Sequence, residues 1–143
     1  MAQTAAVETP DVKESVRQQF SAVAANYSTS SVHAAGIDLA KMVEVAQPGG
    51  DETLLDAGCG AGHTALIFAP HVQRVIAFDL SNEMLGQVQK LASERGLANI
   101  ETRKGDVENL PFADATFDIV TSRYSAHHWP NPQRAVAEIR RVL

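Results

Sequence analysis

Residues 53–64, TLLDAGCGAGHT, constrain the fold of this chain more than any other stretch. A short apolar run ends at Asp56, and glycines follow at three alternate positions, Gly58, Gly60 and Gly62. Glycine tolerates a positive φ in a sharp turn, and its lack of a Cβ lets a ligand reach backbone N–H groups. The stretch therefore predicts a strand, a tight turn and the start of a helix, with a small molecule bound at the turn.

The spacing of the glycines distinguishes three kinds of ligand-binding turn. The dinucleotide pattern G-x-G-x-x-G needs a third glycine where this chain has His63, which is expected to be exposed at a helix start. A P-loop needs G-x-x-x-x-G-K-[ST], and no lysine follows this turn. The pattern that fits is D-x-G-x-G-x-G, in which Asp56 is placed to hold a cationic group of the ligand by a charge-assisted hydrogen bond.

Four later segments follow this turn: VIAFDLS, GDVENLPF, FDIVTSRYSAHHW and AVAEIRRVL. Together with LLDAGCGAG they resemble, in order and spacing, the motifs of class I S-adenosylmethionine-dependent methyltransferases. The similarity covers about residues 20–143 and is greatest to the branch that includes ubiquinone and menaquinone methyltransferases. It implies an α/β fold, a Rossmann-like three-layer sandwich with a mostly parallel sheet, of which four strands are present in the order 3-2-1-4.

The resemblance also implies which residues bind S-adenosylmethionine. Asp79 stands about 20 positions after the glycine turn, where a Rossmann-like unit binds ribose hydroxyls. Asp106 matches the acceptor of the adenine amino group, and Tyr27 matches a tyrosine near the ligand. Arg123 either contacts the amino acid end of the cofactor or simply ends a strand. The implied set is Asp56, Gly58, Cys59, Gly60, Gly62, Asp79, Leu80, Met84, Asp106, Val107, Arg123 and Tyr27.

The adjacent histidines His127 and His128 are the candidates for a catalytic base. They follow the fourth predicted strand, and open α/β sheets bind ligands beyond the carboxyl ends of their strands. Alternatively, one histidine is exposed and the other bonds backbone carbonyls. Two adjacent histidines without a third ligand make a poor metal site, so no metal is predicted. Cys59 is interpreted as a small residue whose backbone lines the ligand, because no Cys/His pair is evident.

Three regions are predicted along the chain. Residues 1–8 are small and polar and are expected to be disordered. Residues 9–50 are expected to form a helical N-terminal extension that ends at the breaker QPGGD. From residue 51 to residue 143, strands and helices alternate, which predicts part of a methyltransferase domain with a parallel sheet and right-handed crossovers.

The first predicted helix begins at Thr9 and Pro10 and runs to about residue 26. Its apolar residues recur at helical spacing and define one face, at Val12, Val16, Phe20 and Val23. The resemblance allows two interpretations of this helix. It is either a lid over the cofactor site or a surface helix anchored by an aromatic side chain.

Local signals place the other elements. Ser81 and Asn131 are expected to cap two helices, and Gly96 is expected to end the first of these. Strands are predicted between turn signals at residues 53–55, 75–78, 100–104 and 117–122.

Composition limits the classes of partner. The net charge is −5 and the 12 lysines and arginines are scattered, so neither a nucleic-acid site nor a membrane-surface site is indicated. One cysteine cannot form an internal disulfide, which agrees with a reducing compartment. No apolar run is long enough to span a membrane, and a cytoplasmic location is expected.

The reaction implied by the resemblance is transfer of the sulfonium methyl group to a small-molecule acceptor by in-line displacement. The family has a seven-strand sheet, whereas this sequence predicts four strands, so the chain is expected to be C-terminally truncated. The alternative is a cofactor-binding or assembly fragment without catalytic activity of its own. The fourth strand, FDIV, then forms an open edge, which predicts either pairing with a second copy into a dimer or marginal stability of the chain.

Overall fold

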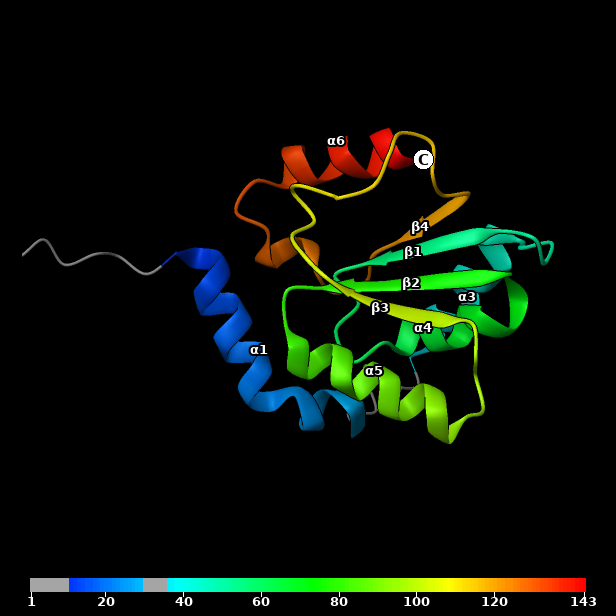
Figure 1. The fold of residues 1–143 in the computed structure, drawn as a ribbon, viewed down its shortest axis with the longest axis horizontal. Helices are drawn as coiled ribbons and strands as arrows, with labels where there is room; N and C mark the ends of the chain where they lie inside the picture. Colours follow the sequence, from blue (N-terminus) through cyan, green and yellow to red (C-terminus); the bar gives the residue numbers. More distant parts are fainter. Residues whose placement is uncertain (1–10, 30–35) are drawn as a thin grey trace, which may run out of the picture.

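The computed structural model describes residues 11–29 and 36–143, except for the side chains of residues 27–29. In this part of the chain a four-stranded parallel sheet lies between layers of helices (Figure 1). The strands lie in the order β3-β2-β1-β4, which confirms the predicted Rossmann-like α/β fold. Their bounds are β1 (Thr53–Ala57), β2 (Arg74–Asp79), β3 (Ile100–Lys104) and β4 (Ile119–Thr121).

The central strands are buried on both faces, as the continuous apolar runs of parallel strands require. Neighbouring residues of a strand point to opposite faces, and both Leu54 and Leu55 of β1 are fully buried. The face of Leu55 packs against α6, and the face of Leu54 packs against α3, α4 and α5 (Figure 1). The described helices and 3-10 turns are α1 (Val12–Thr29), α3 (Ile37–Ala46), α4 (His63–Phe68), η1 (Ala69–His71), α5 (Asn82–Glu94), η2 (Ala126–His128) and α6 (Pro132–Val142).

Helix α1 packs against α5 at the end of the sheet where the strands finish (Figure 1). It extends past the predicted end, and its predicted start at Thr9 and Pro10 lies outside the described residues. Val16 and Phe20 lie on its inner face, but the predicted face is wrong at Val12, which is 57% exposed. The inner position in the first turn is instead taken by Lys13, whose contacts are described below.

The predicted helix ends are confirmed by hydrogen bonds and backbone angles. Ser81 Oγ accepts the N–H of Met84 at 3.2 Å and caps α5. Asn131 Oδ1 accepts the N–H of Arg134 at 3.1 Å and caps α6. Gly96 follows the end of α5 with a φ of +67°.

Strand β4 is shorter than predicted at both ends. The N–H of Phe117 donates to the carbonyl oxygen of Val142 at 2.9 Å, so residue 117 is paired with the end of α6 rather than with the sheet. Strand pairing with β1 begins only at Ile119, opposite Leu54. The local sequence does not carry this information, because the competing partner lies in the last helix.

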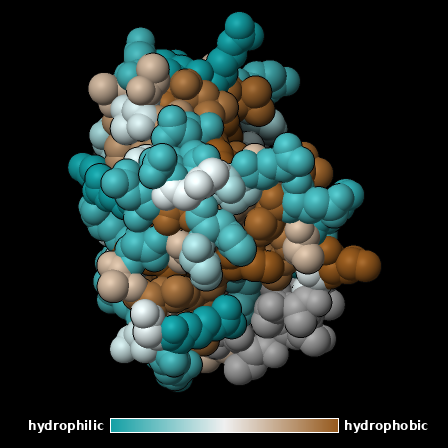
Figure 2. All heavy atoms as spheres, turned by 90° about the vertical axis from the view of Figure 1, so that its right-hand side faces the viewer, coloured by the Kyte–Doolittle hydropathy of each residue, from teal (hydrophilic) through white to brown (hydrophobic). Residues whose placement is uncertain are grey.

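The edge formed by β4 borders a shallow groove that α3 lines on its other side, with Val45 among the lining residues. Val45 is 72% exposed. On the face of the molecule in Figure 2, hydrophobic side chains gather in several patches between hydrophilic ones. Among the described helices, none is both long and apolar enough to cross a bilayer. Dimerisation through the β4 edge stays a prediction.

Two glycines, one within α5 and one just after it, are expected to respond oppositely to alanine. Gly86 is exposed within the helix, and a Cβ added there would meet only open space, so Gly86→Ala should stabilise the fold by about 0.5–1 kcal/mol. Gly96 has a positive φ, so Gly96→Ala should destabilise it by about 1 kcal/mol. Urea unfolding of both variants measures the difference, and a destabilised Gly86→Ala would contradict the helix geometry.

Candidate cofactor site

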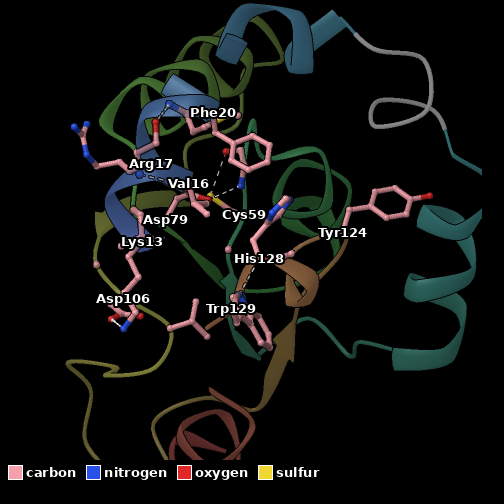
Figure 3. A pocket seen from close by; sticks show the side chains of 18 of the residues that line it. Lys13, Val16, Arg17, Phe20, Cys59, Asp79, Asp106, Tyr124, His128 and Trp129 are labelled. Carbon is pink, nitrogen blue, oxygen red and sulfur yellow. Dashed lines mark hydrogen bonds and ion pairs between the residues drawn. The ribbon is translucent and has the colours of Figure 1, made fainter. Parts of the chain in front are cut away.

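A hollow lies at the carboxyl ends of the strands, with a volume of about 960 Å³ when the open solvent at its mouth is included (Figure 3). Its walls come from the glycine turn after β1, the ends of β2 and β3, the loop after β4 and one face of α1. The structure brings most of the predicted cofactor residues and one of the two predicted bases to this hollow. They are Gly58, Cys59, Gly60, Asp79, Leu80, Met84, Asp106, Val107, Arg123 and His128.

The glycine turn is held by hydrogen bonds to the end of β2. The N–H of Gly58 donates to the carbonyl oxygen of Phe78 at 2.9 Å, and the N–H of Gly60 donates to Asp79 Oδ2 at 2.9 Å. Gly58 has a φ of +70°, and a Cβ here would collide with the side chain of Ser125. Position 58 therefore needs glycine both for its backbone angle and for the close approach of the loop after β4.

Asp79 is the half-buried acid at the end of β2. Its Oδ2 accepts the N–H of Gly60, and its Oδ1 accepts the N–H of Ser81 at 3.0 Å. Burial raises the pKa of Asp79 above its ordinary value, and the two N–H groups partly oppose that shift. Each carboxylate oxygen has two lone pairs, so acceptor capacity remains for two ribose hydroxyls.

The turn after β3 brings Asp106 to the same hollow. The N–H of Gly105 donates to the carbonyl oxygen of Asp79 at 2.9 Å, which joins this turn to the end of β2. Asp106 Oδ1 accepts the N–H of Glu108 at 2.9 Å, and Asp106 Oδ2 lies 2.5 Å from Lys13 Nζ. Lys13 belongs to α1, and it was not predicted as a site residue. The only indication in the sequence is that Lys13 lies next to Val12 of the predicted apolar face.

Asp56 lies outside the hollow, contrary to the direct ligand contact that was predicted for it. Only 1% of its surface is exposed. Its Oδ1 accepts the hydroxyl of Thr121 at 3.0 Å, and its Oδ2 accepts the N–H of Ala65 at 3.1 Å. Burial raises the pKa of Asp56 to about 7. Its carboxyl group thus joins β1 to β4 and to the start of α4 beneath the glycine turn.

The sequence also predicted places for Gly62, His63 and Tyr27. Gly62 does not line the hollow; it precedes α4 with a φ of +89°, and a Cβ there would lie 2.6 Å from Val88 Cγ2. The prediction that His63 is exposed is wrong, since it is 6% exposed and lines the hollow. It is buried because α4 begins under the neighbouring elements rather than at the surface. Tyr27 belongs to the last turns of α1, but its side chain lies outside the described residues.

Arg123 follows β4, and its predicted contact with the amino acid end of the cofactor stays a prediction. It lies just after the strand and lines the hollow, while its guanidinium forms an ion pair with Asp38 of α3. The guanidinium also lies 4.5 Å from the ring centre of Tyr124, which has a φ of +54°. An unusual backbone angle at an aromatic residue beside a hollow is typical of a functional loop.

Only one of the two predicted bases lines the hollow. His128 lines the hollow, where its ring packs edge-on against Phe20 with centroids 4.6 Å apart (Figure 3). His127 is exposed and does not line the hollow, although the two imidazole centroids lie 3.9 Å apart. Trp129 also lines the hollow and donates its indole N–H to Ser125 Oγ at 3.1 Å.

Cys59 lines the hollow, and its surroundings disfavour the thiolate. Burial raises the pKa of its thiol well above the ordinary value, and the carboxylates of Asp79 and Asp56 add to that shift. The thiolate is the nucleophilic form of cysteine, so this environment opposes a nucleophilic role. The arrangement agrees with the interpretation of Cys59 as a small lining residue.

The residues around the hollow fit an S-adenosyl group. The carboxylates of Asp79 and Asp106 offer acceptors for ribose hydroxyls and for an amino group, and the apolar walls beside them come from Leu80, Met84 and Val107. Within the described residues there is no group of three or more His, Cys, Asp or Glu that could hold a metal ion.

Comparison with known proteins gives matches over most of the chain. A sequence model of a methyltransferase domain family matches residues 55–143. The uncharacterized methyltransferase YcgJ of Bacillus subtilis is 44% identical over 124 residues, which are 87% of this chain and 49% of YcgJ. The ubiquinone/menaquinone biosynthesis C-methyltransferase UbiE of Rubrivivax gelatinosus is 30% identical over 141 residues, which are 96% of this chain and 55% of UbiE.

Solved structures share the same fold. The crystal structure of YcgJ matches with a TM-score of 0.72 at 44% identity, over 73% of this chain and 45% of that one. The crystal structure of the [4+2]-cyclase SpnF matches with a TM-score of 0.80 at 26% identity, over 92% of this chain and 56% of that one. This chain spans about half the length of these relatives. From the family match and the identity to YcgJ, the chain belongs to the class I S-adenosylmethionine-dependent methyltransferase family.

Proposed function

We propose that this chain is the cofactor-binding half of an enzyme that transfers the methyl group of S-adenosylmethionine to a small-molecule acceptor. The observation that carries the proposal is the hollow in which the glycine turn, Asp79 and Asp106 meet. Family membership supports the cofactor, and the roles of individual residues are part of the proposal. Because the chain spans about half of its relatives, the acceptor is left at the level of a chemical class.

The proposed roles follow the walls of the hollow. Asp79 accepts the ribose hydroxyls, Asp106 accepts the adenine amino group, and the glycine turn lets the rest of the ligand approach the backbone. When bound, S-adenosylmethionine supplies an electrophilic methyl group on a positively charged sulfur. The protein holds this group in line with the acceptor nucleophile and excludes water, and such positioning can lower a barrier by up to roughly 7–11 kcal/mol.

His128 is the proposed base for an acceptor that must lose a proton. It lines the hollow, and partial burial, followed by repulsion from His127, lowers the pKa of His128. The imidazole is therefore neutral near pH 7 and able to accept a proton. His127 contacts the ring of His128 and does not line the hollow, so it is not the proposed base.

A second function is supported by the length of the match, since this chain spans about half the length of its relatives. The alternative is a cofactor-binding or assembly fragment without catalytic activity of its own. The fold alone does not decide the reaction, because SpnF shares it and is named a [4+2]-cyclase. A dimer through the β4 edge and a cytoplasmic location stay predictions under both functions.

Calorimetric titration with S-adenosylhomocysteine tests the cofactor site. The wild-type chain is expected to bind with roughly micromolar affinity. Asp79→Ala should weaken binding by at least about 100-fold, because the variant loses two hydrogen bonds to a charged acceptor. Circular dichroism of the variant establishes that the fold is retained.

Two controls make the titration specific. Asp51 is exposed and lies outside the hollow, so Asp51→Ala should bind like the wild type. NAD should not bind, since the glycine spacing differs from the dinucleotide pattern. Equal binding by Asp79→Ala and the wild type would remove Asp79 from the site, and a folded wild-type chain that does not bind would refute the proposed cofactor site in this chain.

A further inference from the structure

One face of α1 forms a wall of the cofactor hollow. Lys13, Val16, Arg17 and Phe20 are spaced at three and four residues, so they lie on the same side of the helix, and all four line the hollow (Figure 3). The helix is attached to the rest of the protein at both ends of this face. The two attachments differ in their chemistry.

The attachment at the N-terminal end of α1 is ionic. Lys13 Nζ lies 2.5 Å from Asp106 Oδ2 and 2.9 Å from Glu108 Oε2, so one ammonium group bridges two carboxylates on the turn after β3. The three side chains keep 29%, 32% and 11% of their surface exposed, respectively. Partly exposed ion pairs of this kind are weak and are screened by salt.

The attachment at the C-terminal end is packed and mostly apolar. Ala24 is 5% exposed and joins Ala61 and Met84 in a buried cluster, against which Phe20 packs. Beside this cluster, Ser21 Oγ is hydrogen-bonded to Ser81 Oγ at 2.8 Å and donates to Glu83 Oε2 at 2.6 Å. Burial of apolar surface does not weaken with salt as an ion pair does, so this end stays attached when the other opens.

We propose that Lys13 is a positioning residue of the cofactor site: its ion pairs with Asp106 and Glu108 latch α1 across the hollow, and α1 opens from this end to let the cofactor enter and leave. This inference rests on the proposed cofactor. The latch closes over the adenine end of the site, because Asp106 is also the proposed acceptor of the adenine amino group. The buried cluster around Ala24 acts as the hinge.

Stopped-flow kinetics with S-adenosylhomocysteine tests the latch. Lys13→Met keeps the length of the side chain and removes its charge, so the association and dissociation rate constants should both rise by about five- to tenfold, while Kd changes by less than about threefold. Glu108→Gln should also raise both rate constants, by a smaller factor. Lys13→Arg keeps the charge and should stay within about twofold of the wild type.

A control variant and the dependence on salt distinguish the loss of the latch from the loss of any positive charge. Lys41→Met removes an exposed lysine that pairs with Glu44 away from the hollow, and both rate constants should be unchanged. Raising the salt concentration should speed exchange of the ligand in the wild type and have little effect in Lys13→Met. Unchanged rates in Lys13→Met would overturn the proposal, as would a faster dissociation with unchanged association, which would make Lys13 a simple ligand contact.

Hydrogen exchange of the ligand-free protein tests the latch independently of the cofactor. In Lys13→Met the amides of residues 13–20 should exchange about five- to tenfold faster, whereas those of β1 should exchange as in the wild type. Equal exchange of residues 13–20 in the two proteins would overturn the latch. If the wild type does not bind S-adenosylhomocysteine, the proposed cofactor fails, and hydrogen exchange still decides whether Lys13 holds α1 closed.

Discussion

Gly62→Ala is expected to destabilise the fold by about 3 kcal/mol, although this glycine does not line the cofactor hollow. Two costs combine at this position. A Cβ must adopt a φ of +89°, and it lies 2.6 Å from a methyl group of Val88, which is fully buried in the core and cannot move away freely. Left-handed strain costs about 1–2 kcal/mol and overpacking of a core about 1–3 kcal/mol. Urea unfolding of the variant measures the sum.

A double-mutant cycle separates the two costs. Val88→Ala removes the obstructing methyl groups, so in that background Gly62→Ala should cost only about 1 kcal/mol, the strain alone. Gly60→Ala is the matched control, because it also has a positive φ but no atom within 4 Å of the Cβ position, and it should cost about 1 kcal/mol. Additive effects of Gly62→Ala and Val88→Ala would contradict the steric explanation.

The difference between these glycines bears on how glycine-rich turns are interpreted. The alternation of Gly58, Gly60 and Gly62 indicates one ligand-binding unit, yet each glycine answers a different requirement. Gly58 makes room for Ser125, Gly60 lines the hollow and donates to Asp79, and Gly62 lets α4 approach α5. The spacing predicts the turn but does not predict what each missing side chain would meet.

Elements that depend on neighbours in the sequence were predicted well. The apolar runs of β1 and β2 and the caps at Ser81 and Asn131 are local signals, and each is present in the structure. The order of the strands followed from the resemblance to a known family. The resemblance also implied Asp79, from its spacing after the glycine turn, and this residue lines the hollow at the end of β2.

Contacts between distant parts of the chain were not predictable in this way. Lys13 and Asp106 are 93 residues apart, and Arg123 and Asp38 are 85 apart. Each pair forms because a helix, α1 or α3, lies near the carboxyl ends of the strands. Nothing in the local sequence pattern indicates which distant residue such a side chain contacts. The same limit explains the error at Asp56: an acid at the end of a strand looks identical whether a ligand or the protein itself satisfies it.

Asp56→Asn is expected to stabilise the protein at neutral pH. The size of this stabilisation should fall as the pH is lowered. Burial raises the pKa of Asp56 in the fold to about 7 from its ordinary value of 3.8, so the folded state keeps a proton that the unfolded state has lost. This contribution to stability is present in full below about pH 4 and is lost as the pH rises towards 7. Asparagine has no proton to lose, so Asp56→Asn should gain up to about 4 kcal/mol over the wild type above pH 7.

The hydrogen bonds of Asp56 permit the substitution. The amide oxygen of asparagine can accept the N–H of Ala65, and its NH₂ group can donate to Thr121 Oγ, which accepts as well as donates.

Urea unfolding at pH 5 and pH 8 should therefore show a larger advantage of Asp56→Asn at pH 8, whereas the exposed control Asp51→Asn should differ from the wild type equally at both. If Asp56→Asn is less stable than the wild type by the same amount at both pH values, Asp56 is ionised in the fold. The carboxylate beneath the glycine turn would then stabilise the fold relative to an amide, and its negative charge near Asp79 would favour a positively charged cofactor.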